Sequence, residues 1–181
     1  MRVILPTNQL SGHAGAVHFA LTLCGYLGEL RAALEAASST SDDPYEKVQA
    51  LTDAFVDYSL AYPAFVDCAL TLMRRTGEEL FGEISEHVMF KLGVSIAEAL
   101  QTVIDTLDHG VARGEFFIKD TTLTANLLYA SGLGAVQLAR VGILVKSGHE
   151  KLPEIGPLTA DDVRRHLVAV ALAFTRPFED N

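Results

Sequence analysis

Apolar residues recur at steps of three and four along most of this 181-residue chain, and no stretch sustains an apolar–polar alternation. Steps of three and four place side chains on one face of a helix, whereas alternation marks a half-buried strand. The pattern therefore predicts an all-α fold with about six helices. Their expected ranges are about 15–37, 44–61, 63–73, 78–112, 121–145 and 159–175, preceded by an irregular lead-in.

Several of these helices have recognisable ends. Asp43 is expected to cap the second helix, with Pro44 in its first position, because an aspartate oxygen can accept from the free N–H groups of a helix start. Pro63 separates the second helix from the third, since proline disfavours helix in the residue before it. In the long tract 78–112, Gly93 is the expected position of a kink or an interruption.

The helix predicted at 121–145 contains Gly132 and Gly134 in an apolar context. A glycine inside a helix costs about 1 kcal/mol relative to alanine. Small residues also let two helix axes approach closely, and the dispersion energy gained can exceed that cost. We therefore expect this helix to make close helix–helix contact, between two copies of the chain.

The composition is that of one globular domain, with 49% apolar residues, 20% charged residues and a net charge of −9. A surface that wraps DNA phosphates needs a basic stripe, and the sequence has none. Cys24 and Cys68 stand in apolar helical segments, as expected of buried thiols in a reduced, cytoplasmic protein. The apolar run 14–27 is too short to span a bilayer, so no membrane partner is predicted.

The sequence offers no catalytic motif. It has no GxSxG, no P-loop, no GxGxxG and no Cys/His cluster with metal-ligand spacing. Glu79, Glu83 and Glu86 have helical spacing, but no histidine partners them at metal-site offsets. We interpret the protein as a non-enzyme without a cofactor or a metal.

An apolar cavity between the central helices is better supported as a site. Aromatic and aliphatic side chains with few polar anchors suit a hydrophobic small molecule, although the same residue types at helical spacing also fill ordinary cores. The candidate lining residues are Phe55, Tyr58, Phe65, Cys68, Met73, Phe81, His87, Met89, Phe90, Gln101, Ile104, Asn126 and Tyr129.

The order of helices and breaks resembles the C-terminal regulatory domain of the TetR family of transcriptional regulators. Three segments carry the likeness. In residues 54–75, a helix ends before a proline and a short helix follows. Residues 100–142 contain a helix, a Gly-Glu-aromatic turn and an Asp-capped helix with small residues, and residues 158–178 form a final helix. The resemblance implies an all-α domain that binds a small apolar effector and forms a homodimer.

The resemblance also divides the chain. Residues 29–181 correspond to the ligand-binding and dimerisation domain, and residues 1–28 form a lead-in and the start of the first helix. Those 28 residues are too few for the three-helix DNA-binding unit with which the family begins, so they are at most a remnant of it. DNA is expected as a partner only if a helix-turn-helix head lies outside this chain.

In the TetR family, the last two long helices pair with their copies in a four-helix bundle. The residues expected at such an interface are Leu123, Leu127, Ala130, Gly134, Leu138, Val163, Leu167, Val170 and Phe174. The same two helices could instead form the central core of a monomer. The first functional hypothesis is a TetR-like regulatory domain; the alternative is a headless helical dimer that binds a ligand or a protein without DNA.

Overall fold

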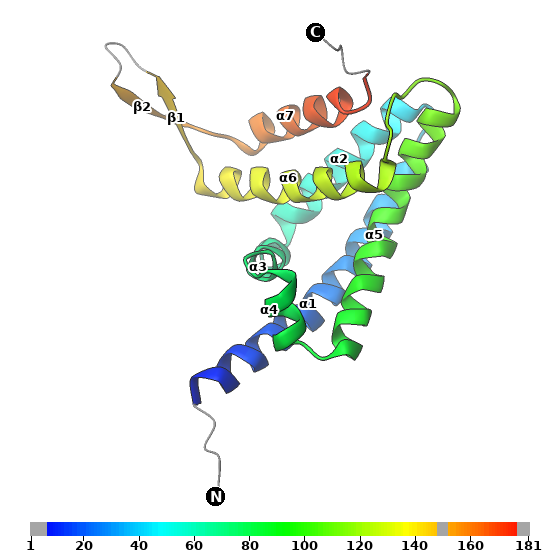
Figure 1. The fold of residues 1–181 in the computed structure, drawn as a ribbon. Helices are drawn as coiled ribbons and strands as arrows, with labels where there is room; N and C mark the ends of the chain where they lie inside the picture. The colour runs from blue at the N-terminus through cyan, green and yellow to red at the C-terminus, as the bar shows by residue number, and fades with distance from the viewer. Residues whose placement is uncertain (1–6, 148–151, 177–181) are drawn as a thin grey trace, which may run out of the picture.

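The computed structural model describes residues 7–147 and 152–176, which contain seven helices and one two-stranded hairpin (Figure 1). The elements are α1 (Thr7–Ser38), α2 (Pro44–Ala61), α3 (Pro63–Met73), α4 (Gly77–Glu83), α5 (Glu86–Ala112), α6 (Thr121–Val141), β1 (Ile143–Ser147), β2 (Pro153–Pro157) and α7 (Ala160–Ala173). The all-α fold class predicted from the sequence is confirmed.

The helices pack as two groups (Figure 1). α1 packs along α5 and against α2 and α3, while α6 and α7 lie side by side and pack across α2. Apolar side chains from both groups meet in one core, where Leu27, Leu30, Val56, Phe65 and Leu133 are almost completely buried. This burial is the main free-energy gain that holds the two groups together.

Arginines at the edge of this core connect the two groups. Arg140 of α6 forms an ion pair with Asp67 of α3, at 2.7 Å between Nη1 and Oδ1. Arg164 of α7 pairs with Asp53 and Asp57 of α2. Partly exposed ion pairs contribute at most about 1 kcal/mol each, so they orient α6 and α7 more than they stabilise them.

The predicted helix starts are present. At the start of α2, Asp43 Oδ1 accepts hydrogen bonds from the backbone N–H groups of Tyr45 (2.9 Å) and Glu46 (3.0 Å). At the start of α7, Thr159 and Asp162 form a reciprocal capping box, in which each side chain accepts from the other residue's backbone N–H. Each cap contributes about 1 kcal/mol by satisfying N–H groups that the helix cannot pair.

The tract 78–112, predicted as one helix with a kink at Gly93, is two helices, and the break lies elsewhere. Ile84 has an extended backbone and is only 3% exposed, while Ser85 caps α5 by accepting from the Val88 N–H at 3.4 Å. Gly93 is an exposed position inside α5. The break therefore follows from the burial of one side chain and a serine cap, and the glycine is not its cause.

The first helix is longer than predicted. α1 begins at Thr7, before the predicted start at Gly15, and continues past residue 28 without a break. Residues such as Asn8 and Gly12 disfavour helix by at most about 1 kcal/mol each, which a long helix tolerates. Residues 1–6 of the predicted lead-in lie outside the described residues.

The helix predicted to reach residue 145 ends at Val141, and an unpredicted hairpin follows. Gly142 has φ +73°, the left-handed conformation that commonly ends a helix, and its N–H donates to the Leu138 carbonyl oxygen at 3.1 Å. Strands β1 and β2 then pair antiparallel, with Val145 opposite Ile155. Branched residues favour extended backbone, but this five-residue strand was too short to show an alternation.

Gly132 makes its close contact inside the protomer. A Cβ atom placed at this position would lie 2.7 Å from Cε1 of Phe55 on α2. The missing side chain therefore lets α6 approach the ring of Phe55. Gly134 differs, because it is exposed and an added Cβ would meet nothing within 4 Å.

This contact yields a paired prediction about stability. We expect Gly132→Ala to lower the free energy of unfolding by about 1–3 kcal/mol, because the methyl group overlaps the Phe55 ring. Gly93→Ala, which adds a methyl group to an open helix position, should raise it by up to about 1 kcal/mol. Urea denaturation followed by circular dichroism measures both values, and equal stabilisation by the two changes would contradict the contact.

Candidate functional site

An apolar cavity of about 70 Å³ lies between five helices. Leucines of α1 form one wall, α2 and α5 form the sides, and α6 and α7 close it. The lining residues are Leu27, Leu30, Leu34, Val48, Leu51, Thr52, Phe55, Ile96, Ala99, Leu100, Val103, Leu107, Ala125, Leu128, Tyr129, Gly132, Leu167 and Ala171. None of them is charged, so an ionised ligand would find no counter-ion in this wall.

Two hydroxyl groups provide the polar side-chain atoms of the cavity. Thr52 Oγ1 donates to the Val48 carbonyl oxygen of its own helix at 2.8 Å. Tyr129 forms no side-chain hydrogen bond within residues 7–147 and 152–176, and its ring packs edge-on against Phe55 at 6.2 Å between centroids. Burial raises the pKa of Tyr129, so its hydroxyl stays neutral and free to donate.

Of the predicted lining residues, Phe55 and Tyr129 line the cavity. Tyr58, Phe65 and Cys68 are buried in the adjoining core, where the Phe65 ring lies 6.3 Å from Phe55 and 5.5 Å from Tyr58. The Tyr58 hydroxyl donates to the Tyr26 carbonyl oxygen at 2.9 Å, and burial together with the nearby Glu29 raises the pKa of Tyr58. Tyr58, Phe65 and Cys68 therefore belong to the core beside the cavity, and Phe65 packs against the lining residue Phe55.

The remaining predicted lining residues do not line the cavity, which corrects that part of the prediction. Met73, Phe81 and Phe90 are exposed large apolar side chains, His87 is exposed, and Met89 is partly buried against the core. Met73 ends α3 and Phe81 lies on α4, while residues 87–90 lie in the first turns of α5, before its lining residues, which lie between 96 and 107.

The predicted lining residues Gln101 and Asn126 are also exposed. Gln101 Nε2 donates to Asp105 Oδ1 at 2.7 Å, and Asn126 Nδ2 donates to the Thr122 carbonyl oxygen at 2.9 Å. Ile104 is partly buried, but it packs in a second apolar cluster around Leu107 and Phe116. On α5, residues 100 and 103 face the cavity, and positions 101 and 104 are rotated away from it.

The sequence-based prediction missed the contribution of α1 and α7. Leu27, Leu30 and Leu34 of α1 and Ala171 of α7 line the cavity. Leu27, Leu30 and Leu34 were recognisable as one apolar stripe at steps of three and four, but nothing local shows which helix faces a cavity. The small residue at 171 gives no signal of its own.

The predicted interface residues separate into two groups. On α6, Leu123, Leu127, Gly134 and Leu138 are exposed on one long stripe, and Ala130 is partly buried. On α7, Phe174 at the helix end is 38% exposed and Val170 is partly buried. Val163 and Leu167 are only 6% exposed, since both pack into the protomer core. Both side chains therefore face the protomer core and not the exposed surface of α7.

No group of three or more His, Cys, Asp and Glu side chains within residues 7–147 and 152–176 is arranged to hold a metal ion. No helix in the same residues is long and apolar enough to cross a membrane. Both findings concern this part of the chain alone.

Solved structures give the family-level comparison. No protein-family model matches the sequence, and no curated protein matches it. A bacterial regulatory protein in the TetR family from Rhodococcus RHA1 superposes with a TM-score of 0.63 at 12% identity, covering 88% of this chain and 72% of that one. The TetR family transcriptional regulator PfmR from Thermus thermophilus gives a TM-score of 0.61 at 18% identity, covering 90% and 75%.

The third match is a transcriptional regulator of the TetR/AcrR family from Thermobifida fusca, with a TM-score of 0.53 at 20% identity. It covers 87% of this chain and 73% of the other. The chain has the TetR-regulator fold. The resemblance predicted from the order of helices is thus confirmed for the fold.

Proposed function

We propose that residues 29–181 form the regulatory domain of a cytoplasmic TetR-like transcriptional regulator, a homodimer that senses an uncharged, apolar small molecule. The single observation that supports this best is the position of the cavity. Its wall includes α1 and α7, and it also includes the inner side of α6, whose outer side carries exposed leucines. A molecule in the cavity would therefore contact both the first helix and the proposed dimer layer.

Coupling follows from that position. A ligand that prefers a wider cavity would shift the population toward a state in which Leu27, Leu30 and Leu34 move relative to α6. Because α1 is one continuous helix of 32 residues, a small displacement at the cavity becomes a larger displacement at its far end. A DNA-binding head attached to that end would change its spacing within the dimer.

The chemistry of the wall defines the ligand. Apolar cavities of about 150 Å³ bind benzene, so this smaller cavity must widen for a ring. We expect benzene and phenol to bind in isothermal titration calorimetry and benzoate to fail, because its carboxylate would be buried without a counter-charge. Tyr129→Phe should weaken the binding of phenol by about 0.5–1.5 kcal/mol and leave the binding of benzene unchanged, because only phenol has a polar group that the Tyr129 hydroxyl can contact.

A filled cavity should not bind these probes. Val103→Phe on α5 places a ring in the cavity. We expect this variant to lose benzene binding, and we expect its free energy of unfolding to fall by about 1–3 kcal/mol. Val111→Phe, on the same helix but exposed and outside the cavity, is the matched control and should bind like the parent chain. Unchanged benzene binding by the Val103 variant would place the site elsewhere.

The dimer proposal rests on the exposed stripe of α6. Leu127 lies within this stripe and is 46% exposed. A charge at this position would be buried in the proposed interface. We expect sedimentation velocity at micromolar concentration to show a dimer, and Leu127→Asp to weaken it by more than about tenfold. Met73→Asp, a similarly exposed apolar position on α3, should leave the dimer intact; equal loss in both variants would contradict the α6 interface.

The alternative is a helical dimer that binds a ligand or a protein without DNA, and the two differ in whether a helix-turn-helix head is joined to this domain. With a net charge of −9, residues 1–181 alone are expected to give no sequence-specific gel shift at physiological salt. A chain extended by a helix-turn-helix head should give a shift that benzene or phenol alters. A specific shift by residues 1–181 alone would contradict the charge argument.

A further inference from the structure

The hairpin between α6 and α7 has one apolar and one polar face. In its antiparallel register, Ile143 lies opposite Pro157, Val145 opposite Ile155, and Ser147 opposite Pro153. Paired residues in a two-stranded sheet point to the same side, so the β-branched residues and the prolines share one face. On the other face Lys146 lies opposite Glu154, and the partly buried Leu144 lies opposite Gly156.

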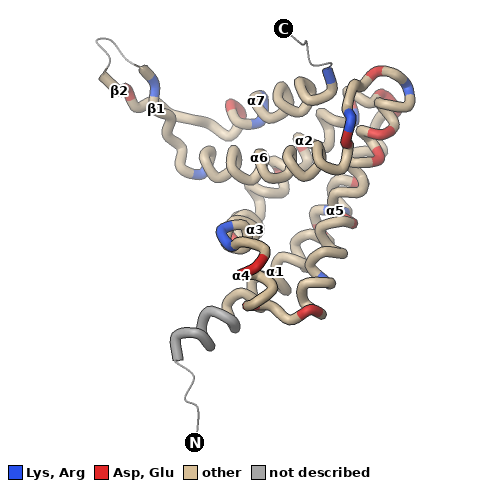
Figure 2. Tube along the Cα trace, viewed as in Figure 1, with Lys and Arg blue, Asp and Glu red and all other residues tan. Residues whose placement is uncertain are grey.

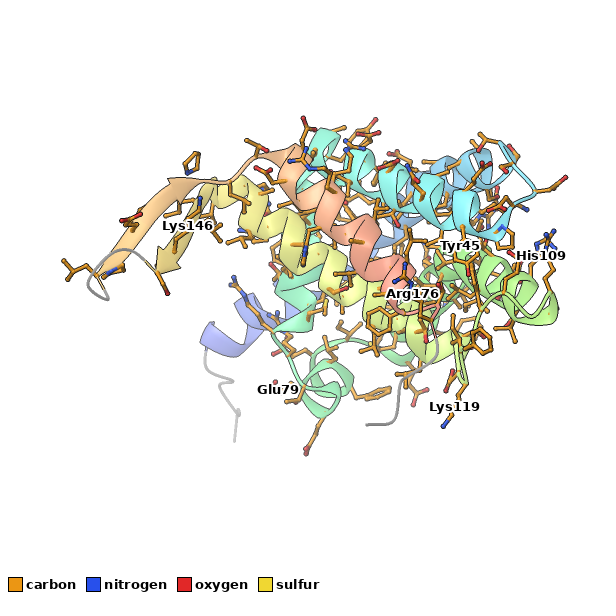
Figure 3. The ribbon with its side chains drawn as sticks, turned by 90° about the horizontal axis from the view of Figure 1, so that it is seen from above. Tyr45, Glu79, His109, Lys119, Lys146 and Arg176 are labelled. Carbon is orange, nitrogen blue, oxygen red and sulfur yellow. The ribbon has the colours of Figure 1, made fainter. Side chains whose placement is uncertain are left out.

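The apolar face of the hairpin is not covered within the protomer. Val145 is 65% exposed and Ile155 is 72% exposed, and the hairpin projects beyond the ends of the two helices that it joins (Figures 1 and 3). An isolated two-stranded hairpin is marginally stable in water. A second surface that covers the branched side chains would stabilise it.

A second exposed apolar patch lies at the opposite end of the same helix pair. Phe117, Leu123 and Phe174 are exposed there, and the Phe117 N–H donates to the Thr175 carbonyl oxygen at 2.9 Å, which joins the start of α6 to the end of α7. Figure 3 shows the separation of the two patches: Lys146 marks the hairpin and Lys119 marks the start of α6.

The lengths of these elements fit a two-fold arrangement. α6 has 21 residues, so each end lies about 15 Å from its centre. In an antiparallel pairing of two α6 helices, the hairpin of one copy begins beside the start of α6 in the other. A five-residue strand then extends about 16 Å past the start of the partner's α6, the end at which the partner's Phe117 and Leu123 lie.

The charge distribution favours a second copy as the occupant. The chain has a net charge of −9, so two copies repel unless they meet through an uncharged surface. α6 contains no acidic residue and one basic residue, Arg140 (Figure 2). Arg140 is paired with Asp67. The exposed stripe of α6 continues through Leu138 and Val141 into Ile143, so the hairpin extends one uncharged apolar surface.

From this geometry we propose that the β1–β2 hairpin is an arm that packs its apolar face on the partner subunit, over Phe117, Leu123 and Phe174 at the far end of the helix pair. The contact is isologous, so each dimer contains it twice. The inference rests on the proposed α6-mediated dimer and adds to it a surface that reaches beyond the helices.

The first test compares dissociation constants of the full chain by sedimentation velocity. Ile155→Asp buries a charge under the arm and should weaken the dimer by at least about tenfold. Lys146→Asp, on the polar face of the same hairpin, is the matched control and should change the dissociation constant of the dimer by less than about threefold. Excising residues 143–157 should also weaken the dimer without unfolding the chain, because the Leu158 N–H lies 3.0 Å from the Gly142 carbonyl oxygen.

The second test locates the arm by cross-linking. An Ile155→Cys chain mixed with a tagged Leu123→Cys chain should form a disulfide heterodimer under mild oxidation, whereas Glu154→Cys with Leu123→Cys should not. The parent chain, whose Cys24 and Cys68 are buried, is the background control. Cross-linking of Ile155→Cys to itself, but not to Leu123→Cys, would overturn the proposed contact in favour of arm-to-arm packing.

The results separate the two proposals. A dimer that Leu127→Asp weakens but Ile155→Asp, the excision and the cross-link leave unaffected would overturn the arm and keep the α6 interface. A parent chain that is monomeric at micromolar concentration would overturn both. Weakening by Ile155→Asp and by the excision, together with the Ile155–Leu123 cross-link, would establish the arm.

Discussion

The contact between the Phe55 ring and the α6 backbone at Gly132 determines how closely the two helical groups approach. A Cβ atom there would lie 2.7 Å from the ring, so the glycine sets the separation of α2 and α6. Phe55 is in turn held edge-on by Phe65 and Tyr129, and the cavity lies beside this aromatic group. The space that a ligand would occupy therefore depends on an approach that only a residue without a side chain permits.

The same helix has different chemistry on its two sides. Its inner side presents Ala125, Tyr129 and Gly132 to the cavity, and its outer side presents exposed leucines without an acidic residue. In a strongly acidic chain, such an uncharged surface is where two copies can meet without repulsion. One helix thus links the proposed ligand site with the proposed interface, as a regulatory domain requires.

The candidate site was predictable only in part. Phe55 and Tyr129 were identified because both are aromatic residues on helices that had to be central. Phe81 and Phe90 were misplaced because hydrophobic periodicity does not reveal that Ile84 leaves the helix and enters the core. Leu167 was assigned to an interface, although α7 uses its one apolar stripe within the protomer. Each error concerns which neighbour a side chain faces, which periodicity does not encode.

The sequence by itself determined the all-α class, most helix ranges, the capped start at Asp43 and the start of the last helix at 159, because these depend on residues within a few positions of each other. Only the tertiary structure decided that Gly132 serves the protomer core, that α1 lines the cavity and that the strands 143–147 and 153–157 pair in a projecting hairpin. These features depend on contacts between residues far apart along the chain, and the free energy of such contacts exists only once the helices have packed.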